Sequence, residues 1–197
     1  MRTTDRRIAY AELHAWSNFT FLEGGSHPEE LIDRAAELEL AAIALTDRDG
    51  LYGTVRFASR ARQRGVDAIV GSELTFEDGA HIVLLVEDER GYANLCELIS
   101  AAQMRGSKGD ARLRIEDFDG RSKGLVLLSS TRDLVRAAAF HAIFDERFYL
   151  ELQHHLTPGD AERNAALIVL ARELHVPCVA TTAWCTRGSR KRNLPTC

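Results

Sequence analysis

The chain has 197 residues and a formal net charge of −4; 45% of its residues are hydrophobic and 27% are charged, as in an ordinary globular protein. A chain of this length buries a substantial core without disulfides, and its slightly acidic balance gives no bulk signal of nucleic-acid binding. No apolar run approaches the roughly 20 residues that cross a membrane, and the N-terminus lacks the apolar stretch of a signal peptide. The four scattered cysteines predict no disulfide framework, so we expect a protein of the reducing cytoplasm.

The first third of the chain predicts strands that alternate with amphipathic helices. AELHAW (11–16) is typical of a strand, and Ser26 is the expected N-cap of a helix with a proline and two acids in its first turn. AAIALT (41–46) reads as a strand buried on both faces, as in a parallel sheet. We expect a second helix to end at Gly65 and DAIVGSEL (67–74) to form a third strand.

The rest of the chain continues this alternation. We expect four more strands, at HIVLLVED (81–88), GLVLLSS (124–130), RFYLELQ (147–153) and PCVATT (177–182). Helices are expected over about 92–105, 132–139 and 160–175, the last capped by Asp160. Seven strands alternating with helices predict an α/β fold with a parallel sheet. The pattern does not distinguish a closed barrel from an open sheet, but in both folds sites lie at the carboxyl ends of the strands.

Side chains able to bind metals collect at these predicted strand ends. They are His14, Asp47, Asp49, Glu73, His154 and His155, with His81 at the start of the fourth strand. Imidazoles and carboxylates together bind zinc, manganese or iron. Two or three such ions can cleave a phosphoester by polarising the phosphoryl group and ionising a water. Acids and histidines are common at strand ends in α/β enzymes, so spacing alone assigns no catalytic residue.

The amino-acid sequences of several segments are more informative than the spacing of these side chains. ELHAWSNFTFLEGGSHPEEL, AIALTDRDGLYG and IVGSEL resemble the polymerase and histidinol phosphatase (PHP) domain, in the form found at the N-terminus of bacterial C-family DNA polymerases. The likeness continues to Thr182, and LQHHLTPGD is closer to the error-prone paralogue than to the replicative DNA polymerase III alpha subunit. The resemblance implies a distorted, seven-stranded, TIM-like β/α barrel with a metal site at its mouth.

The resemblance also implies a ligand set, and part of it is present. His14 matches the first histidine of the family's His-x-His motif, and Glu23 replaces the aspartate of Leu-Asp-Gly. Glu73 matches the glutamate of Gly-x-Glu, and His81 the histidine eight residues later. His155 matches a later His or Cys position.

Other ligand positions are lost. Trp16 stands where the second histidine of His-x-His is expected, and Arg48 replaces the histidine of Thr-Asp-His. The closing Asp-x-His motif falls on Ala183 and Cys185. Of these four residues, only the cysteine can bind a metal ion.

Two interpretations of the site stay open. A guanidinium stays charged and accepts no bond, so Arg48, set among acids that include Asp47, could replace the charge of a metal while Trp16 fills its volume. Alternatively, one zinc or manganese ion is held by the partial set His14, Glu73, His81 and Cys185.

Three functions follow from the resemblance. The favoured one is a PHP domain that serves an error-prone polymerase as a structural or interaction module, because this chain has no room for the polymerase aspartates. The full-length polymerase would add nucleotides with magnesium in replication and translesion repair, with DNA, the replication clamp and mutagenesis factors as partners. The alternatives are a metal-dependent phosphoesterase or 3′–5′ exonuclease, and a stand-alone phosphatase related to histidinol phosphatase.

The last residues, WCTRGSRKRNLPTC, differ in composition from the rest. They have no apolar period and crowd basic side chains together, which fits either a nucleic-acid patch or a frameshift or truncation in the last barrel unit. We therefore expect a PHP domain over 1–183, with a last unit that is incomplete if the gene is interrupted there, and an atypical basic tail over 184–197.

Overall fold

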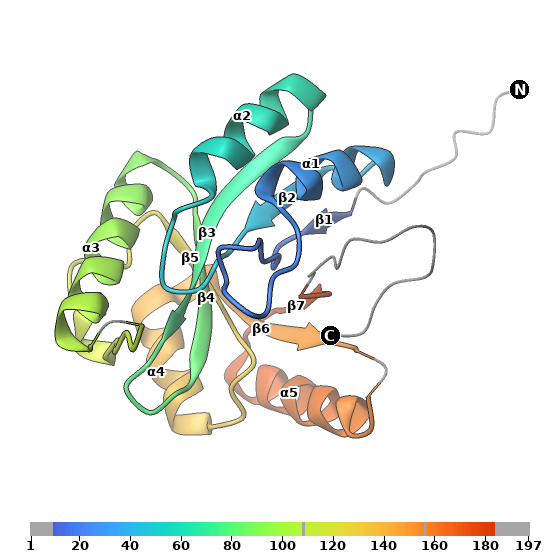
Figure 1. The fold of residues 1–197 in the computed structure, drawn as a ribbon. Helices are drawn as coiled ribbons and strands as arrows, with labels where there is room; N and C mark the ends of the chain where they lie inside the picture. The colour runs from blue at the N-terminus through green and yellow to red at the C-terminus, as the bar shows by residue number, and fades with distance from the viewer. Residues whose placement is uncertain (1–9, 108, 156, 184–197) are drawn as a thin grey trace, which may run out of the picture.

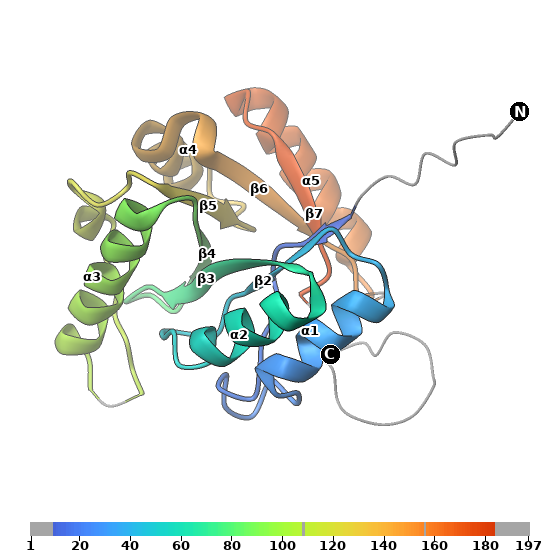
Figure 2. The same ribbon diagram turned by 90° about the horizontal axis from the view of Figure 1, so that it is seen from above.

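A computed structural model describes residues 10–107, 109–155 and 157–183. Seven strands pair in chain order: β1 (Ala11–Glu12), β2 (Ala42–Leu45), β3 (Asp67–Thr75), β4 (His81–Val86), β5 (Leu125–Ser129), β6 (Phe148–Gln153) and β7 (Cys178–Thr181). Five α-helices surround them: α1 (Pro28–Glu37), α2 (Thr54–Arg64), α3 (Glu89–Arg105), α4 (Leu134–Phe144) and α5 (Asp160–Leu174). The helices pack outside a nearly closed barrel of strands (Figures 1 and 2), so the expected α/β barrel is confirmed.

The direction of β4 corrects the expectation of a parallel sheet. β4 is antiparallel to both β3 and β5, whereas the other neighbouring strands are parallel. Only residues 76–80 join β3 to β4, and a connection this short returns the chain antiparallel. His81 therefore lies beside Thr75, at the same end of the barrel as the carboxyl ends of the other strands. We call this end the barrel mouth.

In the described part of the chain, no main-chain ladder pairs β7 with β1. Hydrogen bonds to side chains join the two strands instead. The Glu12 carboxylate is buried and accepts hydrogen bonds from the main-chain N–H of Thr182 at 3.2 and 3.3 Å. It also accepts from the Thr182 hydroxyl and, at 3.0 Å, from the Tyr10 hydroxyl. The Glu12 carboxylate thus joins β1 to the end of β7, whereas main-chain pairing joins the other neighbouring strands. We call this junction of β7 and β1 the seam.

The helix ends follow local chemistry with two corrections. Gly65 ends α2 in the left-handed conformation at φ 67°, as expected. The cap of α1 is His27 instead of Ser26, and its N–H donates to the Glu30 carboxylate at 2.8 Å. Asp160 is the first residue of α5 instead of its cap, because its carboxylate accepts from the N–H groups of His155 and Thr157 before the helix begins.

The hydrophobic core has three parts. The largest lies between α3, α4, α5 and the sheet, where Phe140 packs against Phe76 and Phe148 with ring centroids 5.8 and 5.9 Å apart. A second lies under α1 and α2, and a small third, with Val83 and Leu128, fills the barrel interior. Beside this small apolar cluster, mostly polar side chains line one end of the barrel.

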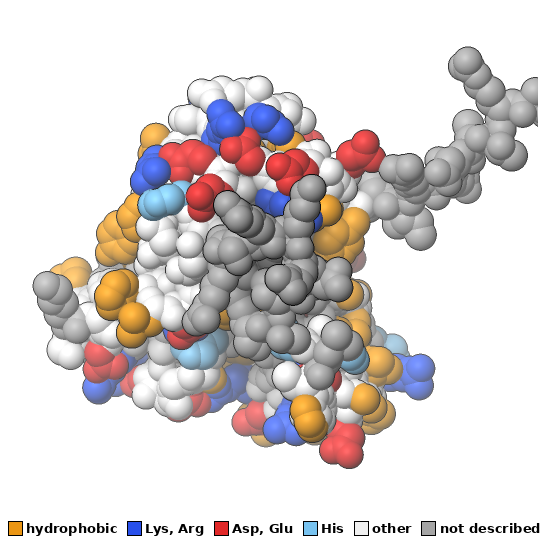
Figure 3. All heavy atoms as spheres, turned by 45° about the vertical axis from the view of Figure 1, so that its right-hand side comes forward, with side chains coloured by type: hydrophobic (Ala, Val, Ile, Leu, Met, Phe, Trp, Pro, Cys, Tyr) orange, Lys and Arg blue, Asp and Glu red, His pale blue; other side chains and the backbone are white. Residues whose placement is uncertain are grey.

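The outer surface of α1 and α2 carries charges of both signs. Figure 3 shows acidic and basic side chains interspersed over these helices at the top of the molecule. Arg56 pairs with Glu29 at 2.6 Å and Arg60 with Asp33 at 2.8 Å, so ion pairs join the two helices. None of the described helices combines the length and the apolar character that crossing a membrane requires.

Phe140→Ala tests the main core. The ring is fully buried among other aromatic rings, so we expect its removal to lower the free energy of unfolding by about 3–5 kcal/mol. Val135→Ala, also on α4 but 79% exposed, is the matched control and is expected to cost less than about 0.5 kcal/mol. Urea denaturation measures both values. Equal losses in the two variants would contradict this packing.

Candidate functional site

A cavity of about 200 Å³ opens at the barrel mouth. Its walls bring together residues from different strand ends, among them His14, Trp16, Arg48, Glu73, His81 and Glu151. All but Glu151 were singled out in the sequence as ligand positions or their replacements. The family motifs therefore do converge on one place in the fold.

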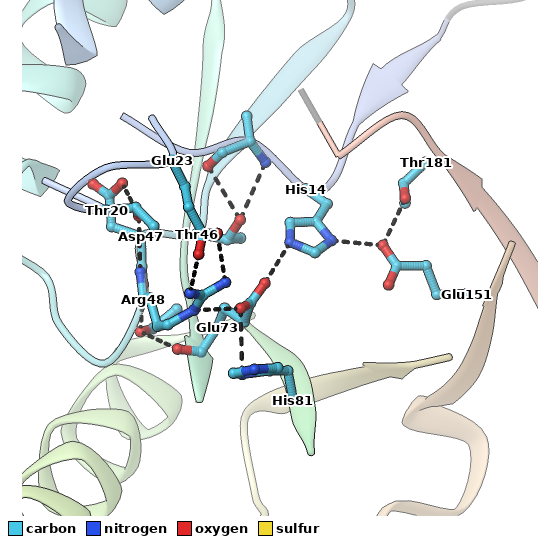
Figure 4. Close-up of polar contacts among 12 residues, drawn as sticks. His14, Thr20, Glu23, Thr46, Asp47, Arg48, Glu73, His81, Glu151 and Thr181 are labelled. Carbon is cyan, nitrogen blue, oxygen red and sulfur yellow. Dashed lines mark hydrogen bonds and ion pairs between the residues drawn. The ribbon is translucent and has the colours of Figure 1, made fainter. Parts of the chain in front are cut away.

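His14 lies buried between two carboxylates. Its Nδ1 is 2.8 Å from Glu151 Oε1 on β6, and its Nε2 is 3.0 Å from Glu73 Oε2 on β3 (Figure 4). Thr181 on β7 donates its hydroxyl to the same Glu151 oxygen at 2.6 Å. One imidazole thus links the chain just after β1 to β3 and β6.

The two carboxylates keep His14 charged. Burial by itself would lower the pKa of His14, but the charges and hydrogen bonds of Glu151 and Glu73 outweigh it and raise the pKa to about 10. Burial raises the pKa of both glutamates, yet the positive charge beside them lowers each below its usual range. Both His14 nitrogens face carboxylate oxygens, and the imidazolium that these carboxylates favour has no lone pair for a metal.

Arg48 extends these pairs toward the solvent. Its Nε donates to Glu73 Oε1 at 2.8 Å, and its two terminal nitrogens donate to the two Glu23 oxygens at 2.6 and 2.8 Å. The guanidinium carbon lies 5.7 Å from the centre of the Trp16 ring, and that ring meets His14 edge-on at 5.2 Å. The resulting series of alternating charges, which we call the ion-pair chain, is Glu151, His14, Glu73, Arg48 and Glu23.

Asp47 serves the neighbouring loop instead of the guanidinium. The main-chain N–H and the hydroxyl of Ser17 each donate to its carboxylate at 2.6 Å, and the Thr20 hydroxyl donates at 2.9 Å. Burial raises the pKa of Asp47, against these hydrogen bonds. The sequence places Asp47 among the acids that surround Arg48; in the structure the Asp47 carboxylate bonds Ser17 and Thr20 and fixes the start of the loop over 17–27.

Of the other expected ligand positions, some lie at the cavity and others do not. His81 lies at the edge of the cavity, with Nδ1 3.5 Å from Glu73 Oε1 and 42% of its side chain exposed. The His155 ring contacts Gln153 at 3.3 Å and lies outside the cavity wall, while Ala183 is buried. Cys185 and the basic tail lie outside the described residues, so their roles stay predictions.

The residues of the ion-pair chain do not fit a metal ion as they are arranged. Within the described ranges, no group of three or more His, Cys, Asp or Glu side chains is placed to hold one. Both nitrogens of His14 donate to carboxylates, and both oxygens of Glu73 accept from His14 and Arg48. A metal ion would have to displace a guanidinium and remove a proton from His14.

Glu151 is the site residue that the sequence analysis missed. A signal was present: FYLELQ alternates, so Glu151 shares a strand face with Tyr149, which packs in the barrel interior. An acid on an inward face needs a buried partner. Glu12 in AELHAW carries the same signal on the other side of the seam.

Known proteins resemble this chain in sequence and in fold. A family model described as the PHP domain matches residues 12–139, more than half of the chain. The error-prone DNA polymerase of Pseudomonas fluorescens is 43% identical over 175 residues, which are 87% of this chain and 17% of that polymerase. The error-prone DNA polymerase of Mycobacterium bovis is 40% identical over 206 residues, covering 89% of this chain and 19% of that one. The chain thus spans less than a fifth of these relatives.

Solved structures share the fold at low identity. A protein from Bifidobacterium adolescentis, assigned as a metal-dependent phosphoesterase, has a TM-score of 0.63 and 14% identity, covering 95% of this chain and 91% of that one. An amidohydrolase from Chromobacterium violaceum with bound sulfate and no metal has a TM-score of 0.59 and 18% identity, covering 95% and 92%. At these low identities, the TM-scores show a shared fold and no shared chemistry.

The raised pKa of His14 predicts how stability depends on pH. The folded protein keeps this proton up to about pH 10, whereas the unfolded chain loses it near 6.5, so the stabilisation is complete below 6.5 and is lost as pH rises through 10. We expect the free energy of unfolding to fall across this window, by at most about 1.4 kcal/mol per pH unit for one proton. Urea titrations from pH 6 to 10 measure the slope.

His14→Gln is the control for this titration. Glutamine fills a similar space without a titrating group, so the variant should be less stable at pH 6 and show a flatter profile up to pH 10. Identical slopes for the variant and the wild type would show that His14 does not carry the proton.

Proposed function

The chain belongs to the PHP domain family, and we propose that it is the PHP module of an error-prone C-family DNA polymerase, acting through structure or interaction instead of metal-dependent chemistry. Its similarity to curated error-prone polymerases over nearly nine-tenths of its length supports the polymerase branch over a stand-alone phosphatase. On this proposal the protein works in replication and translesion repair in the cytoplasm. The magnesium-dependent polymerase chemistry, and the contacts with DNA, the clamp and mutagenesis factors, belong to the larger enzyme.

The position of Arg48 is the observation that carries the metal-free part of the proposal. Its guanidinium makes three hydrogen bonds, at 2.6–2.8 Å, to two of the acids that the family pattern assigns to metal binding. An arginine holds its charge at every working pH but offers no coordination position and cannot ionise a bound water as a metal does. In this proposal Arg48 keeps the electrostatic role of the ion, and the catalytic role is lost.

The main competitor is a working metal-dependent phosphoesterase or 3′–5′ exonuclease. Its support is His81, which is exposed to the cavity and lies 3.5 Å from Glu73, so the two could share a zinc or manganese ion if Arg48 moved aside. Such an enzyme requires Arg48 to exchange between Glu73 and another position. Metal content separates the two proposals.

Metal analysis of the purified, dialysed protein is the direct test. We expect zinc, manganese and iron far below one ion per chain, and no change in melting temperature on adding a chelator. Near-stoichiometric metal in the wild type would overturn the metal-free proposal. The same preparation should release no product from a nitrophenyl phosphodiester with manganese added, and it should extend no DNA primer.

A double variant provides the matched control. Trp16→His with Arg48→His restores the two histidines that the family motif places there and removes the fixed guanidinium. We expect this variant to bind zinc or manganese and to gain melting temperature when the ion is added. Arg48→Lys should bind none, because an ammonium group is not a ligand at neutral pH. Equal metal uptake by wild type and double variant would mean that positions 16 and 48 do not decide binding.

A further inference from the structure

Large exposed apolar side chains gather at the barrel mouth. Leu22 is 85% exposed and Phe21 82% exposed on the loop after β1, while Val55 at 78% and Tyr52 at 69% are exposed where α2 begins. Phe19, 36% exposed, joins the two segments, because its ring centroid lies 6.4 Å from that of Tyr52. We call these five residues the mouth patch.

Further exposed apolar residues lie at the same end. Met104 is 87% exposed at the end of α3, and Val135 is 79% exposed where α4 begins after β5. At the opposite end, Tyr10, Leu38 and Tyr92 are 41–45% exposed, each on a different element. Scattered single residues are usual on a protein surface, whereas apolar residues from neighbouring segments on one face mark an interaction site.

The loop over 17–27 holds its part of the patch in a fixed conformation. Its main chain closes on itself through bonds from Asn18 N–H to Ser26 at 2.7 Å and from Gly24 N–H to Thr20 at 2.9 Å. A Cβ on Gly24 would lie 1.8 Å from the Ser17 carbonyl oxygen, so no side chain fits at this crossing. Leu22 has φ 69°, a conformation that is costly for leucine and that a surface loop without a role would seldom retain.

Two residues that follow β2, Asp47 and Arg48, hold this loop in place. Arg48 holds Glu23, which is next to Leu22, and Asp47 holds Ser17 and Thr20 on either side of Phe19. The residues that follow β2 thus fix the loop that presents the patch. On the proposed function, a site that no longer holds a metal still positions a binding surface.

The course of the chain indicates what covers this surface. β7 runs parallel to β6, and Thr181 at its carboxyl end bonds Glu151 of the ion-pair chain, so the main chain reaches the mouth at residues 181–183. In the polymerases of Pseudomonas fluorescens and Mycobacterium bovis the matched region is 17% and 19% of the protein, so most of each polymerase lies outside it. The polypeptide that follows β7 in those proteins therefore begins at the same end of the barrel as the patch.

We propose that the mouth patch is a docking surface for an apolar segment of the polymerase polypeptide that follows the PHP domain in the longer relatives. The proposal rests on the proposed polymerase origin of this chain. A patch of two phenylalanines, a tyrosine and two aliphatic side chains on a pre-organised loop suits such a partner, because aromatic anchors dominate interface energetics and little ordering is needed on binding.

Binding in trans tests the docking surface. The fluorescently labelled full chain is titrated with the Pseudomonas fluorescens polymerase lacking the region that matches this chain, and the anisotropy is followed. We expect saturable binding by the wild type and at least tenfold weaker binding by Phe21→Ser and Leu22→Ser. Val169→Ser on α5, 63% exposed and away from the mouth, is the matched control and should bind like the wild type. Both test positions are exposed, so their melting curves should match that of the wild type.

Each other outcome overturns the proposal. No saturable binding by the wild type, or equal weakening by the control variant, would remove the docking role. Concentration-dependent dimers of the wild-type chain that Phe21→Ser abolishes would make a second copy the occupant instead. The metal analysis described above does not depend on this binding, so the metal-free site can hold even where the docking surface fails. Arg48→Ala tests whether the metal-free site supports the docking surface. It should weaken binding as the surface variants do, because it releases Glu23 and the loop.

Discussion

The structure of the barrel mouth depends on one buried imidazolium between two carboxylates. Two acids this close in a low-dielectric interior repel each other and lose their hydration, so they stay charged only if a cation lies between them. His14 supplies that cation with both ring nitrogens as donors, and Arg48 supplies the next one outward. The same contacts tie the chain after β1 to β3 and β6, across the side of the barrel where β1 and β7 do not pair. The contacts of His14 with Glu73 and Glu151 therefore neutralise the buried acids and also help to close the barrel.

Such a network stabilises only if each member is satisfied. A buried ion pair often adds little net stability because desolvation offsets the attraction, but removing one partner leaves a buried charge that is costly. Here Glu151 also accepts from Thr181, and Glu73 accepts from two different cations. This makes the network specific: a neutral residue at position 14 or 48 would leave an acid unpaired.

On the proposed function, organic cations take the place of a metal ion, and this changes what the site can do. A guanidinium and an imidazolium supply charge and directed hydrogen bonds, whereas a metal ion also offers open coordination positions to a substrate. In this chain the fixed charges hold a loop whose apolar side chains face the solvent. The proposed shift from catalysis to interaction is thus a consequence of which cation occupies the space between the acids.

The sequence by itself determined the alternation of strands and helices, the end of α2 at Gly65 and the presence of Trp16 and Arg48 where the resemblance implies histidines, because each depends on local periodicity, backbone conformation or the identity of one residue. The antiparallel β4 could also have been read from the short connection before His81. Tertiary structure alone decided that Glu151, 137 residues from His14, is its partner, that the Asp47 carboxylate bonds Ser17 and Thr20 of the loop, and that two carboxylates flank His14. These outcomes depend on burial and on the distance between charges carried by different strands. Both are properties of the folded chain that no stretch of sequence contains.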